Sequence, residues 1–369
     1  MFDAQMNAPH ASARDAHSTP APSRPRIAHR REQPDRRGGV TNQTTGTRPP
    51  GRTDRRRSAA PLRLCAPDGV PLGGFVWRHG ETARPVVVIA PATSVRCRYY
   101  ARFADDLFAK GFDVVTFDYR GIGESRPVSL RGFRADWVDW GEHDLEAALR
   151  YAVAEFRGAP IHVVAHSIGG FALGLAPSNR KIERILTVGA QFAHWRDYGA
   201  ARRYRMLWKW HVAMPALTQI FGYFPAKRLG WMEDTPAGVV RDWSRMTARF
   251  EDTVRRGSFI AGERESELLV RRFAEVTAPI LAIGVGDDTH GTPAAVDRLL
   301  AYFTASLRRH RRIAPSDIGA PSIGHFAFFH DRFKDSLWPL AQLWLRNGEI
   351  APDAPGRMVA EMLPRQAGR

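Results

Sequence analysis

Short runs of apolar residues alternate along the chain with longer stretches in which apolar residues recur at helical spacing. The runs are rich in Val, Ile and Leu and about five residues long, which is typical of strands buried on both faces of a sheet. We expect strands at residues 86–90, 113–117, 161–165, 184–188, 280–285 and 311–314.

The stretches between these runs predict helices. We expect them at residues 98–110, 135–156, 292–300 and 335–345. Strands that alternate with helices form a mostly parallel sheet flanked by helices, because parallel neighbours need a crossover connection. Ahead of this pattern, residues 61–65 and 70–77 flank a Pro-Asp-Gly turn and predict an antiparallel hairpin. The fold class is therefore α/β.

The pattern changes between residues 190 and 276, a stretch that is helical in character and rich in aromatic residues. Five of the chain's ten tryptophans fall here. We expect a helical cap that covers a site, with most rings forming the core of the cap and a minority lining the pocket. The basic residues between the rings are expected on a solvated face.

The remaining sequence divides around this cap. We expect a core built from residues 61–189 and 277–348. Residues 1–60 are rich in Arg, Pro, Ser, Thr and Gly without apolar periodicity, and predict a disordered tail. Residues 349–369 are Pro-rich and predict a loose C-terminal tail.

The chain is strongly basic, with a formal net charge of +16. The first 60 residues hold 12 Arg against 5 Asp or Glu, so +7 of this charge lies in the tail. A basic tail can bind nucleic acid or anionic lipid through counterion release. Because only five of the 54 basic residues are Lys, the composition indicates a GC-rich genome rather than a binding code. We expect no specific nucleic-acid partner, and the tail is either unselective or sequence upstream of the true start.

Two cysteines, Cys65 and Cys97, are too few for a disulfide framework and fit a reducing compartment. The apolar runs are much shorter than the roughly 20 residues of a membrane-spanning helix. The N-terminus lacks the apolar segment of a secretory signal. We therefore expect a cytoplasmic protein, and the sequence leaves its oligomeric state open.

The candidate chemistry begins where the run 161–165 ends. Ser167 follows this strand, with Ala165 two places before it and Gly169 two places after it. Small residues here allow a sharp strand-to-helix turn that lifts a serine oxygen above the sheet, because the two backbones come close together. Since Ser-x-Gly also occurs in ordinary loops, this nucleophile elbow needs partners elsewhere in the chain.

Suitable partners follow downstream. Asp287 and Asp288 come after the strand 280–285, and His325 lies in a later loop. A serine hydroxyl becomes a good nucleophile when an imidazole takes its proton, and the imidazole needs a carboxylate on its other nitrogen. The alternatives are that both aspartates cap the helix at 292–300 and that His325 is a buried loop histidine.

An Asp-x-Arg-Gly-x-Gly-x-Ser turn follows the strand 113–117. We expect Asp118 and Arg120 to be structural, because the turn requires Gly at two positions. Gly121 and Gly123 do not complete a dinucleotide-binding motif, since a third Gly and a downstream acid are missing.

With these motifs in this order, the chain resembles the α/β-hydrolase superfamily from about residue 61 to 348. Within it, the chain is similar to a bacterial group related to serine aminopeptidase-like and monoacylglycerol lipase-like proteins. The narrower resemblance rests on three short segments: Pro91-Ala92-Thr93, Gly222-Tyr223-Phe224-Pro225 and Ile323-Gly324-His325-Phe326.

The resemblance implies a set of site residues. Ser167 is the nucleophile and His325 the base. The usual distance from the strand favours Asp288 as the acid, with Asp287 as the alternative. The loop after the strand 86–90 supplies one N–H group of the oxyanion hole, from Ala92 or Thr93, and Ile168 supplies the other.

We therefore expect a serine hydrolase that cleaves an ester bond of a small, partly apolar substrate through an acyl-enzyme, with no metal or cofactor. An acyltransferase or an amide or peptide hydrolase would use the same triad. A non-catalytic binding module is a further alternative on this fold, and the intact Ser, His and Asp disfavour it.

Overall fold

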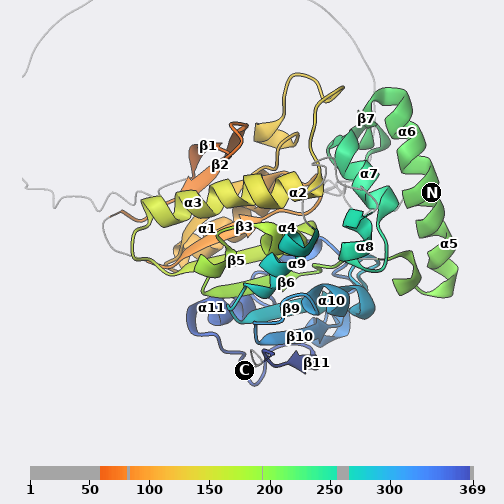
Figure 1. The fold of residues 1–369 in the computed structure, drawn as a ribbon. Coiled ribbons are helices and arrows are strands. Elements are labelled where there is room, and N and C mark those ends of the chain that lie inside the picture. Colours follow the sequence, from red (N-terminus) through yellow and green to blue (C-terminus); the bar gives the residue numbers. More distant parts are fainter. Residues whose placement is uncertain (1–58, 81–83, 193, 256–265, 366–369) are drawn as a thin grey trace, which may run out of the picture. The chain divides into compact units, whose positions relative to one another are not determined.

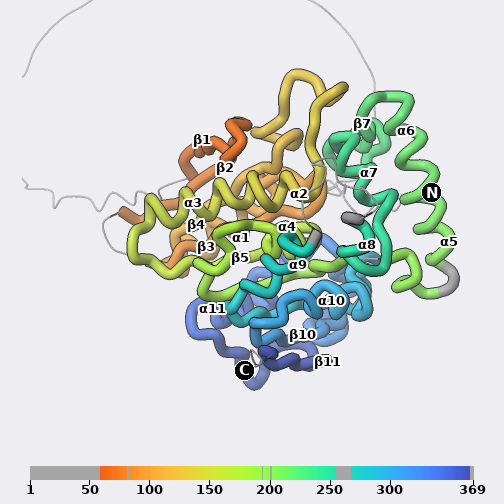
Figure 2. Tube along the Cα trace, viewed as in Figure 1, coloured from red at the N-terminus to blue at the C-terminus, as the bar shows by residue number. Residues whose placement is uncertain are grey.

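The computed structural model describes residues 59–80, 84–192, 194–255 and 266–365. Within these ranges the main sheet has nine strands in the order β1-β2-β4-β3-β5-β6-β9-β10-β11. The six central strands run parallel, and β1, β2 and β11 add antiparallel pairs at the edges. The predicted α/β class, a mostly parallel sheet with flanking helices, is confirmed (Figures 1 and 2).

The strands of this sheet lie close to the predicted apolar runs. They are β1 (Ala60–Cys65), β2 (Pro71–Trp77), β3 (Val86–Ala90), β4 (Asp113–Phe117), β5 (Ile161–His166), β6 (Arg184–Val188), β9 (Ile280–Val285), β10 (Arg308–Ile313) and β11 (Arg357–Met362).

The central strands are apolar because both faces of the sheet are covered. Every residue of β3, β4, β5 and β9 is buried. One face packs on Phe103 and Trp338, and the other packs on Leu149 and Phe171. Burial on both faces explains why these strands lack the in-out alternation of a half-exposed sheet.

The helices of the core follow their strands. They are α1 (Ala101–Ala109), α2 (Trp137–Asp139), the π-helical turn η3 (Trp140–Leu145), α3 (Glu146–Glu155), α4 (Ile168–Leu175), α10 (Pro293–Leu300) and α11 (Trp338–Asn347).

The helix predicted at 135–156 is divided into α2, η3 and α3. Asp136 and Asp139 form a reciprocal capping box that begins α2. Gly141, in η3, allows this turn to lie directly against α4, since a Cβ there would be 2.6 Å from the Leu175 Cβ. The sequence pattern did not reveal the division, because apolar spacing barely differs between α and π turns.

Residues 190–276, which we call the cap segment, connect β6 to β9. The described elements are α5 (Ala200–Trp208), the π-helical turn η6 (Lys209–Ala213), α6 (Met214–Phe221), α7 (Ala237–Arg245), α8 (Phe250–Arg255), α9 (Ser266–Ala274) and the short antiparallel pair β7 (Tyr223–Phe224) and β8 (Thr235–Pro236). The segment is helical as expected (Figure 1).

The C-terminal segment differs from the prediction of a loose tail. β11 pairs antiparallel with β10, which itself begins at Arg308 rather than residue 311. The Arg311 guanidinium donates to the carbonyl oxygens of Pro355 (2.7 Å) and Gly356 (2.8 Å). These contacts between the Arg311 charge and backbone carbonyl groups hold the segment in place. The Pro-rich composition of the segment could not predict them, because Arg311 is distant in sequence.

The predicted N-terminal tail falls, up to residue 58, outside the described residues, as do residues 366–369. Within the described ranges, no helix is long and apolar enough to cross a membrane. Cys65 is an exposed free thiol and Cys97 a buried one.

Candidate active site

Ser167 sits at the turn between β5 and α4 in a strained conformation, with φ 54° and ψ −117°. Among the described residues, only Ser94 and Ser167 combine a positive φ with a side chain. Such strain concentrates at functional turns. A Cβ at Gly169 would lie 2.5 Å from the Ala90 carbonyl oxygen, so a small residue is required there. The chain thus forms the elbow that its small residues predict.

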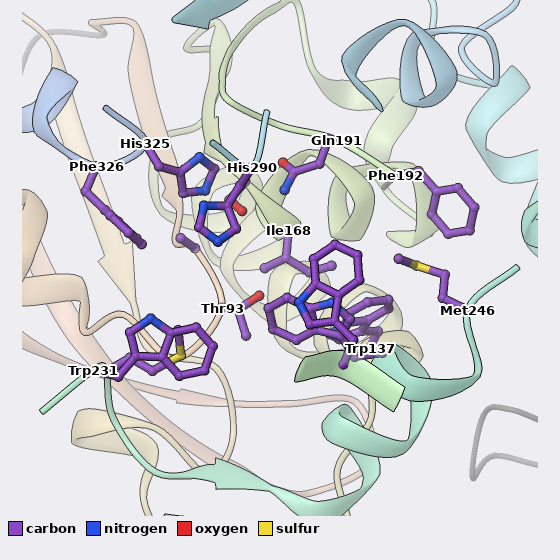
Figure 3. A pocket seen from close by; sticks show the side chains of 15 residues that line it. Thr93, Trp137, Ile168, Gln191, Phe192, Trp231, Met246, His290, His325 and Phe326 are labelled. Atoms are coloured by element: carbon purple, nitrogen blue, oxygen red, sulfur yellow. The ribbon is translucent and has the colours of Figure 1, made fainter. Parts of the chain in front are cut away.

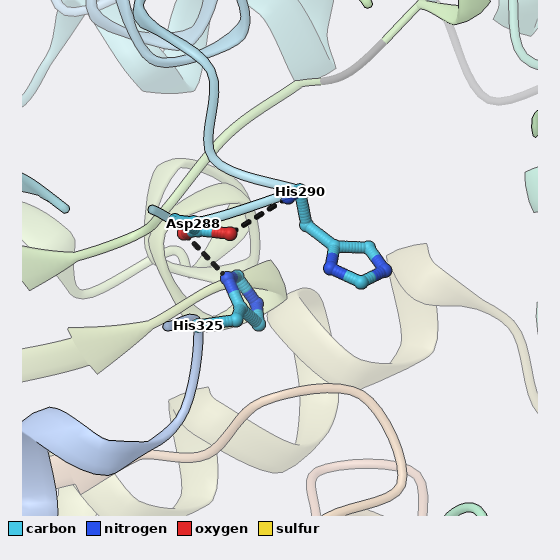
Figure 4. Close-up of side chains that lie close together, drawn as sticks. All are labelled: Asp288, His290 and His325. Carbon is cyan, nitrogen blue, oxygen red and sulfur yellow. Dashed lines mark hydrogen bonds and ion pairs between the residues drawn. The ribbon is translucent and has the colours of Figure 1, made fainter. Parts of the chain in front are cut away.

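Asp288 and His325 are paired beside this turn. The His325 Nδ1 and Asp288 Oδ2 atoms are 2.7 Å apart, and both side chains are buried (Figure 4). Burial alone would raise the pKa of Asp288, but the charge and hydrogen bond of His325 outweigh it and hold that pKa well below its usual range. A carboxylate therefore faces the imidazole at neutral pH.

Asp287 has a different set of partners. Its carboxylate accepts hydrogen bonds from the backbone N–H groups of Ile323 (3.0 Å) and Gly324 (2.8 Å). It therefore holds the loop that carries His325 rather than the imidazole itself. Neither aspartate caps the helix α10, because Thr292 occupies that position and accepts from the Ala295 N–H.

A buried hydrogen-bond network joins three loops of the site. The Ala92 N–H donates to the Tyr100 Oη (2.9 Å), which lies 2.8 Å from the His166 Nδ1. The His166 Nε2 lies 2.9 Å from the His325 carbonyl oxygen. Burial, followed by the charge of His325, lowers the pKa of His166 to about 3. A neutral His166 fixes the donors: Nε2–H donates to the carbonyl, and Nδ1 accepts from the tyrosine hydroxyl.

This network corrects one expectation for the oxyanion hole. Since the Ala92 N–H already donates to Tyr100, it is not free to bind an oxyanion. Thr93 and Ile168 line the pocket together with Ser167, so they remain the candidate donors. The sequence analysis did not predict the roles of Tyr100 and His166 in this network. The only signal in the sequence was that His166 directly precedes Ser167.

A pocket opens above Ser167 between the core and the cap segment. Its empty volume is about 640 Å³, a figure that includes the space at the mouth of the pocket that is open to solvent. Figure 3 shows His290 and His325 close together on one side, and Trp137, Phe192 and Met246 on the other. Trp210, Trp231 and Trp243 of the cap segment also line it. A minority of the cap segment's described rings therefore reaches the pocket, while others, such as Tyr204 and Trp208, are exposed.

His290 is a pocket residue that the sequence analysis did not single out. Its backbone N–H donates to the Asp288 Oδ1 (2.7 Å), and its ring lies 5.1 Å from the His325 ring, centroid to centroid (Figure 4). Burial, followed by the charge of His325, lowers the pKa of His290 to about 3. The neutral ring offers a hydrogen-bonding nitrogen without adding charge beside His325.

Asp288, His290 and His325 are also the described residues best placed to hold a metal ion, with ligand atoms within 4.8 Å of one another. Two of these atoms already form a hydrogen bond at 2.7 Å. A metal ion would have to replace the proton shared by Asp288 and His325. The cluster therefore fits an acid–base pair better than a resident metal.

The Asp-Tyr-Arg-Gly turn lies away from the pocket and supports the core. The Asp118 carboxylate accepts from the N–H groups of Cys97 (2.6 Å) and Glu124 (2.8 Å) and from the Cys97 thiol. Arg120 pairs with the buried Asp144 and with Asp68. These contacts give Asp118 and Arg120 structural roles, and burial raises the pKa of the Cys97 thiol, which keeps it protonated.

Comparison with known proteins places this site in context. A profile of the family described as serine aminopeptidase, S33 (Hydrolase_4) matches residues 81–312. A search of curated proteins gives no match.

Two determined structures are similar over most of the chain. A soluble variant of monoglyceride lipase from Saccharomyces cerevisiae, in complex with a substrate analog, has a TM-score of 0.54 at 16% identity, covering 80% of this chain and 97% of that one. DcsB in complex with its substrate analogue has a TM-score of 0.51 at 14% identity, covering 79% and 100%. At these identities the likeness concerns the fold. The family match spans more than half of the chain, so the protein belongs to the S33 serine aminopeptidase family and is an enzyme of the α/β-hydrolase class.

Proposed function

We propose that the protein is a serine hydrolase that cleaves ester bonds of small, partly apolar substrates through Ser167, His325 and Asp288. The observation that carries the proposal is the 2.7 Å contact between His325 and Asp288, in the pocket that Ser167 also lines. An oriented imidazole beside a strained serine is the arrangement that activates a hydroxyl for acyl transfer.

In the proposed reaction, the Ser167 Oγ attacks the ester carbonyl while the His325 Nε2 takes the hydroxyl proton. His325 then gives this proton to the leaving alcohol, which leaves an acyl group on Ser167. A water molecule attacks this acyl-enzyme while His325 takes a proton from it. His325 then returns this proton to the Ser167 Oγ as the bond to the acyl group breaks and the carboxylic acid departs. Asp288 holds the imidazole in the required tautomer and stabilises its protonated form.

The proposed oxyanion donors are the backbone N–H groups of Thr93 and Ile168. Ile168 is the first residue of α4, where backbone N–H groups have no partner within the helix. The loop that carries Thr93 is tied to the cap segment, because the Ser94 hydroxyl lies 2.6 Å from that of Thr235. A donor fixed in this way stabilises charge that develops in the transition state.

The pocket favours an ester over the peptide substrate that the family name suggests. An aminopeptidase must hold a free α-ammonium group, which a carboxylate would best neutralise. Among the described residues that line this pocket, none is an aspartate or glutamate. An uncharged, apolar acyl group therefore fits this lining better than a peptide N-terminus.

Acyl transfer to an alcohol, amine or thiol is the second candidate. It uses the same acyl-enzyme, and the rings from the cap segment favour it to the extent that they keep water away from that intermediate. Product analysis separates the two reactions: added acceptor alcohols yield new esters from an acyltransferase and leave the acid as the main product of a hydrolase.

The proposal is tested by labelling purified protein with a fluorophosphonate and by assaying short esters. We expect labelling and turnover in the wild type, and loss of both in Ser167→Ala. Ser306→Ala is the matched control, because Ser306 is also buried but donates to the Val276 carbonyl oxygen, outside the pocket. If Ser167→Ala retained full activity, the assignment would be wrong.

A further inference from the structure

The pocket carries a feature that simple ester cleavage does not require. Ester hydrolysis needs the triad and the oxyanion donors, and an apolar wall suffices for a plain acyl chain. Here the side away from His325 includes the indole ring of Trp137 (Figure 3), and the indole ring of Trp210 lines the same pocket. An indole is apolar over most of its surface but carries one N–H donor.

Within the described ranges of the chain, these two indole N–H groups have no hydrogen-bond partner. Trp137 is 4% exposed and Trp210 is 2% exposed, and the Nε1 atom of each is buried and unpaired. Buried indole N–H groups usually find an acceptor, because an unpaired donor loses its contact with water without compensation. The two indole N–H groups are therefore candidates for hydrogen bonds to a bound molecule.

The other buried tryptophans show that this chain normally provides such acceptors. Trp338 Nε1 donates to the Phe328 carbonyl oxygen (2.8 Å) and Trp344 Nε1 to that of Ile185 (2.8 Å). The remaining two, Trp77 and Trp140, donate to the Asp105 carboxylate and the Arg120 carbonyl oxygen. Among the buried tryptophans of the described chain, the two unpaired indoles are the two that line the pocket. Unpaired buried atoms also occur away from the pocket, as at His162.

The two indoles come from different parts of the molecule and meet at one place. Trp137 belongs to α2 of the core and Trp210 to η6 of the cap segment. Both rings pack against Trp243, with centroids 6.0 Å and 5.7 Å away. The same pocket also contains the Gln191 Oε1, a further buried atom without a partner. The residues that line this pocket thus include three buried polar atoms without a partner in the described part of the chain.

The charge of the lining limits what the subsite can bind. No described lining residue is Lys, Arg, Asp or Glu, so an ionised acyl group would be desolvated without a counter-charge. A neutral oxygen accepts a hydrogen bond from an indole at much lower desolvation cost. Flat indole faces also suit planar groups such as a ketone or an aryl ring.

We propose that this subsite selects an uncharged acyl group bearing an oxygen acceptor along its chain, which receives hydrogen bonds from the indole N–H groups of Trp137 and Trp210. This inference rests on the proposed ester cleavage and names its substrate class. A site built to donate to a substrate oxygen discriminates against the analogue that lacks it, because the donors then stay unpaired.

The test compares 4-nitrophenyl octanoate with oxo-octanoates in which a ketone is moved along the chain one carbon at a time. We expect one or two adjacent ketone positions to raise kcat/KM about tenfold over octanoate, the range of one or two neutral hydrogen bonds. Equal kcat/KM for octanoate and for every oxo-octanoate would overturn the inference and leave the proposed ester cleavage intact.

Three variants locate the effect. Trp137→Phe and Trp210→Phe keep an aromatic ring but remove the N–H, so each should lower kcat/KM for the oxo-ester more than kcat/KM for octanoate and thereby lower the preference. Trp243→Phe is the matched control, since Trp243 lines the same pocket and its indole nitrogen is not among the buried unpaired atoms. A preference that survives in both donor variants, or falls equally in the control, would contradict the proposal.

Binding to the Ser167→Ala protein makes the test independent of turnover. Calorimetry with the methyl esters of octanoic acid and of the preferred oxo-acid should show tighter binding of the oxo-ester, lost in Ser167→Ala combined with Trp210→Phe. If the proposed chemistry failed, no ester would be cleaved, but this binding difference would remain. If the subsite assignment failed, esters would be cleaved and both ligands would bind equally.

Discussion

Asp287 and Asp288 are adjacent and chemically identical, yet they contact different groups. Asp288 contacts the His325 imidazole, and Asp287 accepts from two backbone N–H groups of the loop that carries it. Successive side chains leaving a strand point in different directions. One aspartate therefore reaches the ring and the other reaches the backbone of the same loop.

Replacing each aspartate by asparagine should separate these roles. Asp288→Asn should lower kcat by about 10³ to 10⁴-fold, because the imidazole loses the carboxylate that fixes its tautomer. Asp287→Asn keeps one acceptor oxygen and should lower kcat by about tenfold or less. Ester turnover measured beside circular dichroism checks both variants. A larger kcat loss in Asp287→Asn would reverse the proposed assignment.

Tyr100 and His166 do not touch the reacting atoms in the proposed mechanism, but they join the loops that do. Their network runs from the Ala92 N–H through both side chains to the His325 carbonyl oxygen. His166 stays neutral because burial lowers its pKa to about 3. Both residues are therefore positioning residues.

Tyr100→Phe should break this network at its centre. The Ala92 N–H and the His166 Nδ1 lose their partner, which should destabilise the fold by about 1–3 kcal/mol. We expect kcat to fall about tenfold with KM nearly unchanged, because geometry rather than binding is affected. Tyr151→Phe, outside the pocket, is the control. A change confined to thermal stability would argue against a positioning role.

At the scale of elements, the Asp-Tyr-Arg-Gly turn after β4 is a sequence motif whose residues have structural roles. Asp118 accepts hydrogen bonds from Cys97 and Glu124, and a Cβ at Gly123 would lie 2.2 Å from its Oδ2. Glycine is therefore required for the carboxylate to reach the backbone. Burial nevertheless raises the pKa of Asp118 to about 6.

This raised pKa makes a prediction about stability. The unfolded chain releases the Asp118 proton near pH 3.8 and the folded chain near pH 6. Between these values the folded state binds more protons, so the contribution of Asp118 to stability falls as the pH rises through this window. Relative to wild type, Asp118→Asn should be most destabilised near pH 4, and the gap should narrow by up to about 3 kcal/mol towards pH 7.

Urea unfolding of both proteins across this pH range measures the gap. Asp353→Asn is a suitable control, because Asp353 is exposed and the difference in unfolding free energy between this variant and wild type should stay nearly constant across the range. A gap that widens towards neutral pH would contradict the sign of the shift.

At the scale of the whole molecule, the C-terminal strand β11 forms one edge of the main sheet. β11 covers the edge strand β10, and the segment around it provides carbonyl acceptors to the buried Arg308 and Arg311. Ending the chain after residue 352 should lower the free energy of unfolding by several kcal/mol, since both guanidinium groups lose acceptors.

Ester turnover of this truncated protein should stay close to wild type at a temperature where it remains folded, because Ser167 and Asp288 follow other strands and the Asp287 carboxylate still holds the loop of His325. A truncation after residue 365 is the control, because it keeps every described residue of the C-terminal segment. Loss of turnover in the folded, shorter truncation would contradict this prediction and indicate that the pairing of β11 with β10 also holds the His325 loop, which follows β10.

Much of the fold and part of the site could be predicted because their signals are local. Apolar runs marked the central strands, since burial on both faces demands Val and Ile at consecutive positions. Small residues around Ser167 marked the elbow, since backbone proximity excludes larger side chains. The strand β11 escaped prediction because its stabilising partners lie on β10.

The sequence by itself determined the α/β class, the strained serine turn and the presence of an acid and a base in a workable order. Only the tertiary structure decided which aspartate meets His325, that Ala92 has no free N–H, and that two indoles lack acceptors. The physical reason is that hydrogen-bond partners come from residues distant in sequence. Periodicity reports which side of an element is buried, but not what it meets there.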